Sequence, residues 1–166
     1  MALERFLAVR PAFPCTRYLT QVVRPRSMGR TRGRKGGCVS PLVCVRALLW
    51  SVCGMRELIE FDKLSGSGND FVCIDNRDGG CDGLLCSAPE VGRFAAALCH
   101  RGLGVGADGV IFAVRPSDSQ AADVAVRFFE PDGLEVELCG NGTACFARWV
   151  VDSGWVGCGM VHIETP

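Results

Sequence analysis

Residues 137–150, ELCGNGTACFARWV, combine a thiol with small residues at a spacing that could move a proton beside an anion. Cys139 follows a short apolar segment and directly precedes Gly140, Asn141 and Gly142. Because glycine has no side chain, backbone N–H groups around it can close on a small anion such as a carboxylate. The residues that follow favour a helix, and unpaired N–H groups at a helix N-terminus stabilise a thiolate. This pattern suits chemistry at a carbon next to a carboxylate.

Three other interpretations of this stretch compete. Most intracellular cysteines are small buried apolar residues without a chemical role. A zinc site is disfavoured because five residues separate Cys139 from Cys145, where roughly two to four are usual, and the sequence has only two histidines, His100 and His162. A phosphate loop is disfavoured because no Lys-Ser or Lys-Thr follows the glycines. We therefore expect no metal ligands, whereas a structural thiol and a catalytic thiol both remain open on spacing alone.

Four ordered motifs resemble those of the diaminopimelate epimerase family. They are FDKLSGSGNDF at 61–71, HRGLGVGADGV at 100–110, LCGNG at 138–142 and IETP at 163–166. The resemblance implies an isomerase that converts LL- to meso-diaminopimelate, in lysine and peptidoglycan precursor synthesis, by thiol-mediated proton transfer at the α-carbon. It also implies a small-molecule amino-acid substrate and no pyridoxal phosphate or other cofactor.

The same resemblance assigns roles to the residues at matching positions. Two cysteines of this family face opposite sides of the α-carbon, and Cys139 matches the cysteine of the first lobe. The backbone N–H groups of Gly140 and Asn141 would hold the α-carboxylate and stabilise charge as the proton leaves. Asn69 matches a substrate-binding Asn, although without the resemblance a turn-forming Asn is an equal alternative.

Three features depart from the family pattern. Glu130 stands where the family usually has an Asn that contacts the distal end of the substrate, so the exact amino acid is left open. Ala144 stands where an Arg is frequent, and we expect this to affect local support only. No second Cys-Gly-x-Gly sequence occurs before Pro166. We therefore expect an N-terminal lobe that is inactive alone, with a homodimer or a complementing second lobe as its candidate partners.

Two further classes of function remain open. One is another cofactor-independent racemase of the same fold, although proline racemases usually carry His at the position of Asn141, and phenazine-synthesis isomerases do not use this cysteine. The other is a non-catalytic lobe that binds an amino acid or a partner chain.

The two ends of the sequence differ in charge. Residues 1–54 contain ten Lys or Arg and one Glu, whereas residues 55–166 contain eight basic and seventeen acidic residues. Because residues 1–54 lack sustained periodicity, we expect a basic, disordered extension, either transit-like or upstream of a natural start at Met55. The apolar segment 41–53 is too short to span a bilayer. The polybasic stretch 24–35 could bind nucleic acid or an anionic membrane, but a solvated tail is the commoner outcome, so we expect neither a membrane nor a nucleic-acid partner.

Cysteine usage bears on the compartment. Seven of the eleven cysteines follow Met55, an odd number at irregular spacing. With no secretory signal, we expect reduced thiols in a cytoplasmic protein and consider plastid import less favoured.

The order of elements predicts an α+β fold. Alternating or β-rich segments predict strands at 58–64, 71–76, 110–115, 124–130, 134–138 and 160–165. Helical periodicity predicts helices at 87–99, with a Ser-x-x-Glu capping box, and at 143–152. Residues 104–109 match the dinucleotide fingerprint, but a helix precedes them and a strand follows, which argues against nucleotide binding. The resemblance implies a mainly antiparallel, curved sheet wrapped around a central helix.

Overall fold

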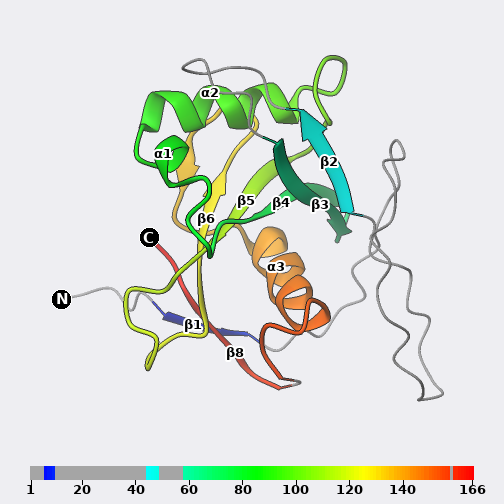
Figure 1. Cartoon of the computed structure of the whole chain (residues 1–166). Helices are drawn as coiled ribbons and strands as arrows, with labels where there is room; N and C mark the ends of the chain where they lie inside the picture. Colours follow the sequence, from blue (N-terminus) through cyan, green and yellow to red (C-terminus); the bar gives the residue numbers. More distant parts are fainter. Residues whose placement is uncertain (1–5, 10–43, 49–57, 158) are drawn as a thin grey trace.

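The computed structural model describes residues 6–9, 44–48, 58–157 and 159–166 of the chain (Figure 1). These residues form strands and helices in an order that mixes hairpins with single helices. The elements are β1 (Phe6–Val9), β2 (Cys44–Leu48), β3 (Leu58–Gly66), β4 (Asn69–Asp75), α1 (Asp82–Leu85), α2 (Ala88–Cys99), β5 (Gly109–Val114), β6 (Val124–Phe129), β7 (Glu135–Val136), α3 (Gly140–Asp152) and β8 (Val161–Glu164).

All the strands belong to one mixed sheet. Its order is β1-β8-β6-β5-β4-β3-β2, and β7 pairs with β6 off this path. Two pairings are parallel, β4 with β5 and β6 with β8, and the other five are antiparallel. The predicted α+β class and mainly antiparallel sheet are therefore confirmed.

The central strands are apolar on both faces because helices cover both. Side chains alternate along a strand, so neighbours such as Val72 and Cys73 face opposite sides of the sheet. Val72 packs in the core beneath α2, and Cys73 packs in the core around α3. Figure 1 shows α2 along one side of the sheet and α3 on the other. This arrangement agrees with the predicted sheet around a central helix.

Helix α2 begins and ends close to the predicted bounds. Its buried face consists of Val91, Phe94, Ala95, Leu98 and Cys99, the residues that the helical periodicity predicts. The predicted capping box is wrong, because Ser87 occupies the N-cap position without a side-chain cap hydrogen bond.

Helix α3 begins three residues earlier than predicted, at Gly140 rather than Thr143. Trp149 ties the helix to the sheet, because its Nε1 donates to Oδ2 of Asp62 on β3 at 2.7 Å. Phe146 and Val150 are fully buried beside it. These contacts fix the second half of α3 against the sheet.

The hairpin between β3 and β4 has two turn residues with positive φ, Ser67 at 56° and Gly68 at 90°. Positive φ at both central residues is typical of a type I′ turn, whose twist matches that of the strands. The register pairs Gly66 with Asn69 directly across the turn. The turn therefore places Asn69 at the first position of β4.

One helix was not predicted. The short helix α1 lies between the predicted strand at 71–76 and the predicted helix at 87–99. Buried Asn76 holds its start, because its Oδ1 accepts from the N–H of Cys81 and its Nδ2 donates to Oδ1 of Asp82. A helix held by polar contacts of this kind shows no helical repeat of apolar residues, so the sequence pattern does not predict it.

Most of the basic extension 1–54 lies outside the described residues. Its two described pieces, β1 and β2, pair antiparallel with β8 and β3 at the two edges of the sheet. The expectation of a disordered extension and the domain boundary at Met55 both stay predictions. Within the described part of the chain, every helix is too short or too polar to cross a bilayer.

Candidate active site

Cys139 is the N-cap residue of α3, where an extended backbone (φ −124°, ψ 110°) turns into the helix. Its carbonyl accepts the first intrahelical hydrogen bond, from the N–H of Thr143 at 2.7 Å, and a second from Oγ1 of the same residue at 2.8 Å. The thiol side chain is half-buried against the core around α3. The predicted thiol at a helix N-terminus is thus present.

The N–H groups of Gly140, Asn141 and Gly142 precede the first intrahelical donor, so they have no acceptor inside the helix. Gly140 and Asn141 are exposed. Such N–H groups, at the positive end of the helix dipole, can bind an anion. The geometry therefore suits the predicted role of Gly140 and Asn141.

The side chains of Asn69, at the start of β4, and Asn141, in the first turn of α3, form a hydrogen bond. Nδ2 of Asn141 donates to Oδ1 of Asn69 at 2.7 Å, although 72 positions separate the two residues. The structure thus brings together two of the predicted substrate-binding residues, one from the opening motif and one from the first turn of α3.

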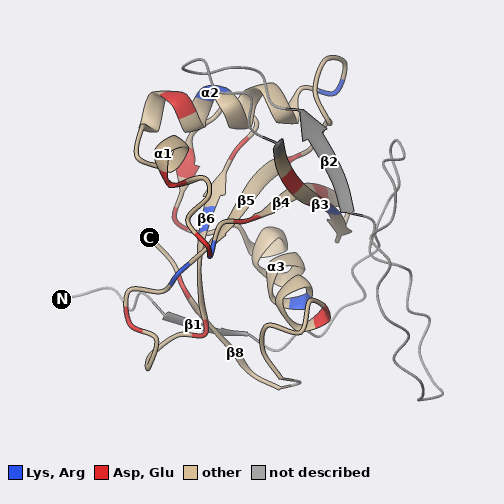
Figure 2. Ribbon diagram, viewed as in Figure 1, with Lys and Arg blue, Asp and Glu red and all other residues tan. Residues whose placement is uncertain are grey.

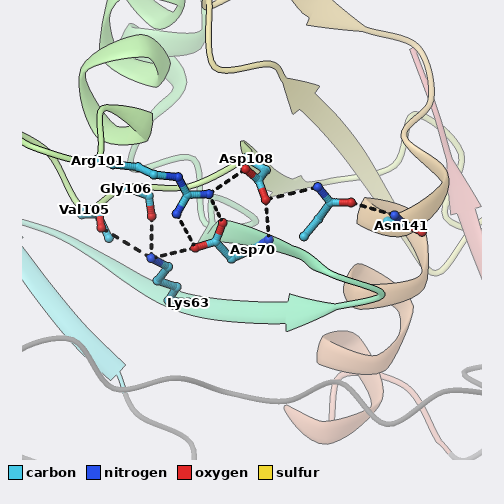
Figure 3. Close-up of polar contacts among 8 residues, drawn as sticks. Lys63, Asp70, Arg101, Val105, Gly106, Asp108 and Asn141 are labelled. Atoms are coloured by element: carbon cyan, nitrogen blue, oxygen red, sulfur yellow. Dashed lines mark hydrogen bonds and ion pairs between the residues drawn. The ribbon is translucent and has the colours of Figure 1, made fainter.

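Behind this pair lies a network of charged side chains (Figure 3). Nδ2 of Asn69 donates to Oδ2 of Asp108 at 3.1 Å, and the N–H of Asp70 donates to the same oxygen at 3.0 Å. Arg101 bridges the two aspartates, with Nη2 2.6 Å from Asp108 Oδ1 and 2.8 Å from Asp70 Oδ1. Lys63 lies 3.0 Å from Asp70 Oδ2. Three of the sequence motifs therefore meet in one network.

The charges around Asp70 favour its ionised form. Burial acts to raise the pKa of this carboxyl, but the hydrogen bonds from Arg101 and Lys63 outweigh burial and lower it from 3.8 to about 2. Hydrogen bonds to Asp70 and Asp108 raise the pKa of Arg101. Over the rest of the described chain, Figure 2 shows acidic residues (red) on strands, helices and loops.

The glycines of residues 104–109 serve close packing. A Cβ on Gly104 would lie 2.1 Å from the carbonyl oxygen of Ala97 near the end of α2. Gly106 has φ +75°, and its carbonyl accepts from Nζ of Lys63. Helix α2 precedes this loop and β5 follows it, which is the reverse of the dinucleotide-binding order.

Glu130 directly follows β6, and its N–H and carbonyl form hydrogen bonds with the turn before β7. Burial, with the negative charges of Asp108, Asp70 and Glu130, raises the pKa of Cys99 to about 11. Ala144 is half-buried within α3.

The fourth motif is structural in this chain. Buried Glu164 accepts from the N–H and from Oγ of Ser117, both at 2.6 Å, and so ties β8 to the loop after β5.

Sequence reasoning missed the roles of Lys63, Asp70, Arg101 and Asp108. A usable signal was present, because all four charged residues lie within the two glycine-containing motifs at 61–71 and 100–110. Among the described residues, no group of three or more His, Cys, Asp or Glu is placed to hold a metal ion.

The mixed sheet packs around α3, and the Cys-Gly-Asn-Gly sequence forms the start of that helix. The sequence model of diaminopimelate epimerases matches residues 61–166. The chain belongs to the diaminopimelate epimerase family.

Three relatives illustrate the similarity. A diaminopimelate epimerase of Archaeoglobus fulgidus is 50% identical over 107 residues, which are 64% of this chain and 35% of that protein. One of Desulfitobacterium hafniense is 45% identical over 107 residues, with the same two shares. A chloroplastic diaminopimelate epimerase of Oryza sativa subsp. japonica is 48% identical over 97 residues, 58% of this chain and 25% of that protein.

The chain spans about a third of the length of the first two of these relatives. Among solved structures, a phenazine biosynthesis protein of the PhzF family from Bacillus anthracis matches with a TM-score of 0.42 and 25% identity. That match covers 64% of this chain and 31% of the other.

Proposed function

We propose that this chain acts as one lobe of a cofactor-independent amino-acid epimerase of the diaminopimelate type, with Cys139 as its proton-transfer group. The observation that carries the proposal is the 2.7 Å hydrogen bond between Asn69 and Asn141. It places a side chain of the opening motif against the first turn of α3, the helix that has half-buried Cys139 as its N-cap.

The chemistry follows from this arrangement. The Cys139 thiolate takes the α-proton, so a C–H bond breaks, an S–H bond forms and the electron pair moves from the α-carbon into the carboxylate. The N–H groups of Gly140 and Asn141 stabilise the charge that develops there. Inversion then requires an acid on the opposite face of the carbon.

The opposite acid has no matched residue in this chain. The 166 residues contain one Cys-Gly-x-Gly sequence. Of the other described cysteines, Cys73, Cys99 and Cys145 are buried. We therefore propose that the chain needs a complementing lobe, or less favourably a second copy, for inversion.

Glu130 bears on the substrate. It lies at the end of β6, where the resemblance places contacts to the distal end of the substrate. A carboxylate there attracts the distal ammonium of diaminopimelate and repels its distal carboxylate. We propose diaminopimelate as the substrate, with weaker distal binding than an Asn at this position would support.

Titration of the ¹⁵N-labelled chain with LL-diaminopimelate tests the proposal. We expect saturable shifts of the backbone N–H signals of Gly140 and Asn141, and of the side chain of Asn69. Cys86→Ala, which alters an exposed cysteine outside the site, is the matched control and should bind as the parent does. No shift at the start of α3 would contradict the proposal, and shifts without any Cys139-dependent proton exchange would favour a non-catalytic amino-acid-binding lobe.

The compartment is a separate proposal. We propose a cytoplasmic location for this chain. The Oryza sativa relative is named as chloroplastic, so fusion of residues 1–54 to a fluorescent protein is the direct test.

A further inference from the structure

The side chains of Asn141, Asn69 and Asp108 are linked by two hydrogen bonds, and in both the donor lies on the Asn141 side and the acceptor on the Asp108 side. Asp108 Oδ2 accepts from Asn69 Nδ2, and Asn69 Oδ1 accepts from Asn141 Nδ2. A carboxylate in an ion pair can only accept hydrogen bonds, whereas an amide presents an acceptor at one end and donors at the other. The carboxylate of Asp108 therefore decides the orientation of the amide groups of both Asn69 and Asn141.

The orientation of each amide group is fixed by the hydrogen-bonding partner before it. Because Asp108 accepts, Asn69 must turn its NH₂ group toward Asp108 and its oxygen toward Asn141. Asn141 must then turn its NH₂ group toward Asn69. Its own Oδ1 is left as the acceptor of an exposed side chain at the second position of α3, two residues after Cys139.

Asp108 is well placed for this role because three groups hold it. Arg101 contacts Oδ1 at 2.6 Å, and the N–H of Asp70 shares Oδ2 with Asn69 at 3.0 Å. The N–H of Asp108 itself donates to the carbonyl of Asp70 at 2.7 Å. The carboxylate is therefore fixed on both oxygens and by its backbone, and a fixed acceptor orients its donor.

We propose that Asp108 is a positioning residue that sets the direction of the Asn69–Asn141 pair and so presents Oδ1 of Asn141 as an acceptor for the ammonium group of an amino-acid ligand. This inference rests on the proposed function for the identity of the ligand. The α-carboxylate then binds the N–H groups at the start of α3, while the ammonium group binds the Asn141 oxygen. The two charged groups of one amino acid are thereby distinguished.

The first experiment needs no ligand. Side-chain NH₂ signals of Asn69 and Asn141 are recorded in the ¹⁵N-labelled chain, in Asp108→Asn and in Asp70→Asn. Asp70→Asn is the matched control, because it removes a carboxylate from the same Arg101 network but keeps the acceptor for Asn69. We expect Asp108→Asn to shift the Asn141 signals and speed their hydrogen exchange about fivefold or more, as expected when a hydrogen bond is weakened. Asp70→Asn should leave them unchanged.

The second experiment tests the ligand. We expect the parent chain to bind 2-aminopimelate more tightly than pimelate, which lacks an ammonium group, and Asp108→Asn to reduce that preference about fivefold. Asn141 signals that do not respond to Asp108→Asn, in a chain whose backbone spectrum is intact, would overturn the inference. A parent chain that binds neither compound would contradict the proposed function, while the NH₂ signals would still decide the positioning role.

If Asp108→Asn does not fold, a variant of Asn141, the residue at the opposite end of the hydrogen-bonded series, provides the test. Asn141→Asp cannot donate to Asn69, but Asn69 should keep its NH₂ group on Asp108. Retained protection of the Asn69 NH₂ signals supports the inference, and their loss overturns it.

Discussion

A Cβ atom added to Gly142 would lie 3.2 Å from Sγ of Cys139 and 3.1 Å from a ring carbon of Phe128. The glycine lies in the first turn of α3, and its φ lies outside the left-handed region, so the requirement is one of space. The absent side chain leaves room for the thiol between the helix and Phe128 of β6.

The first prediction concerns Gly142→Ala. Alanine gains about 1 kcal/mol over glycine inside a helix, whereas crowding in a packed region costs about 1–3 kcal/mol. We therefore expect a net loss of about 0–2 kcal/mol in the free energy of unfolding, together with a displaced thiol. The alkylation rate of Cys139 should change several-fold, measured by mass spectrometry. Gly83→Ala is the control, because a Cβ there meets nothing within 4 Å. An unchanged Cys139 rate would refute the steric argument.

The second prediction ranks the thiols. Cys139 should be alkylated at neutral pH faster than Cys99, Cys145 or Cys86. Burial and neighbouring carboxylates raise the pKa of Cys99 to about 11, so little of it is thiolate at pH 7. Cys145 is buried, and Cys86 is exposed but follows the C-terminal end of α1. Brief labelling with iodoacetamide and peptide mapping give the order. Faster labelling of Cys86 would show that exposure outweighs the helix N-terminus.

The third prediction concerns acid. The pKa of Asp70 falls from 3.8 to about 2 on folding, so the unfolded chain binds more protons between these values. The stabilisation is fully present above about pH 4 and is lost as the pH falls toward 2. Because Arg101 is 60% exposed, solvent screening reduces the contribution to about 1–2 kcal/mol. Asp70→Asn should therefore lower the free energy of unfolding at pH 7 by that amount and by almost nothing near pH 2. Urea titrations at both pH values measure the difference, and a pH-independent loss would contradict the assignment.

The fourth prediction is that the 166-residue chain does not invert diaminopimelate on its own. One thiol can return a proton only to the face from which it came. Incubation with LL-diaminopimelate in deuterium oxide should yield no meso isomer. Inversion with α-deuterium incorporation, abolished by Cys139→Ala, would show that this chain suffices.

The sequence predicted the individual helices and strands better than it predicted which strands pair with one another. The α2 periodicity identified its five buried residues, because a helix facing one core repeats its apolar positions every three or four residues. The parallel pairing of β4 with β5 was not predicted. Strands that are apolar on both faces, as around Val72 and Cys73, indicate burial without naming a partner.

The candidate site was predicted in part. The position of Cys139 before a helix follows from its glycine neighbours, and the resemblance indicated Asn69. The link from Asn69 through Asp108 to Arg101 was not predicted, because hydrogen bonds between separate loops leave no periodic signal. Such links depend on the topology that brings β4 and the loop before β5 together.

The 72-residue separation between Asn69 and Asn141 also bears on how the molecule folds. Joining two points so far apart in a flexible chain costs on the order of 4 kcal/mol of loop-closure entropy, before any contact between them compensates. Partly folded forms in which β5 and β6 have not joined β4 therefore lack the paired amides. A ligand that needs both residues binds only molecules that have completed this closure, and it shifts the folding equilibrium toward them.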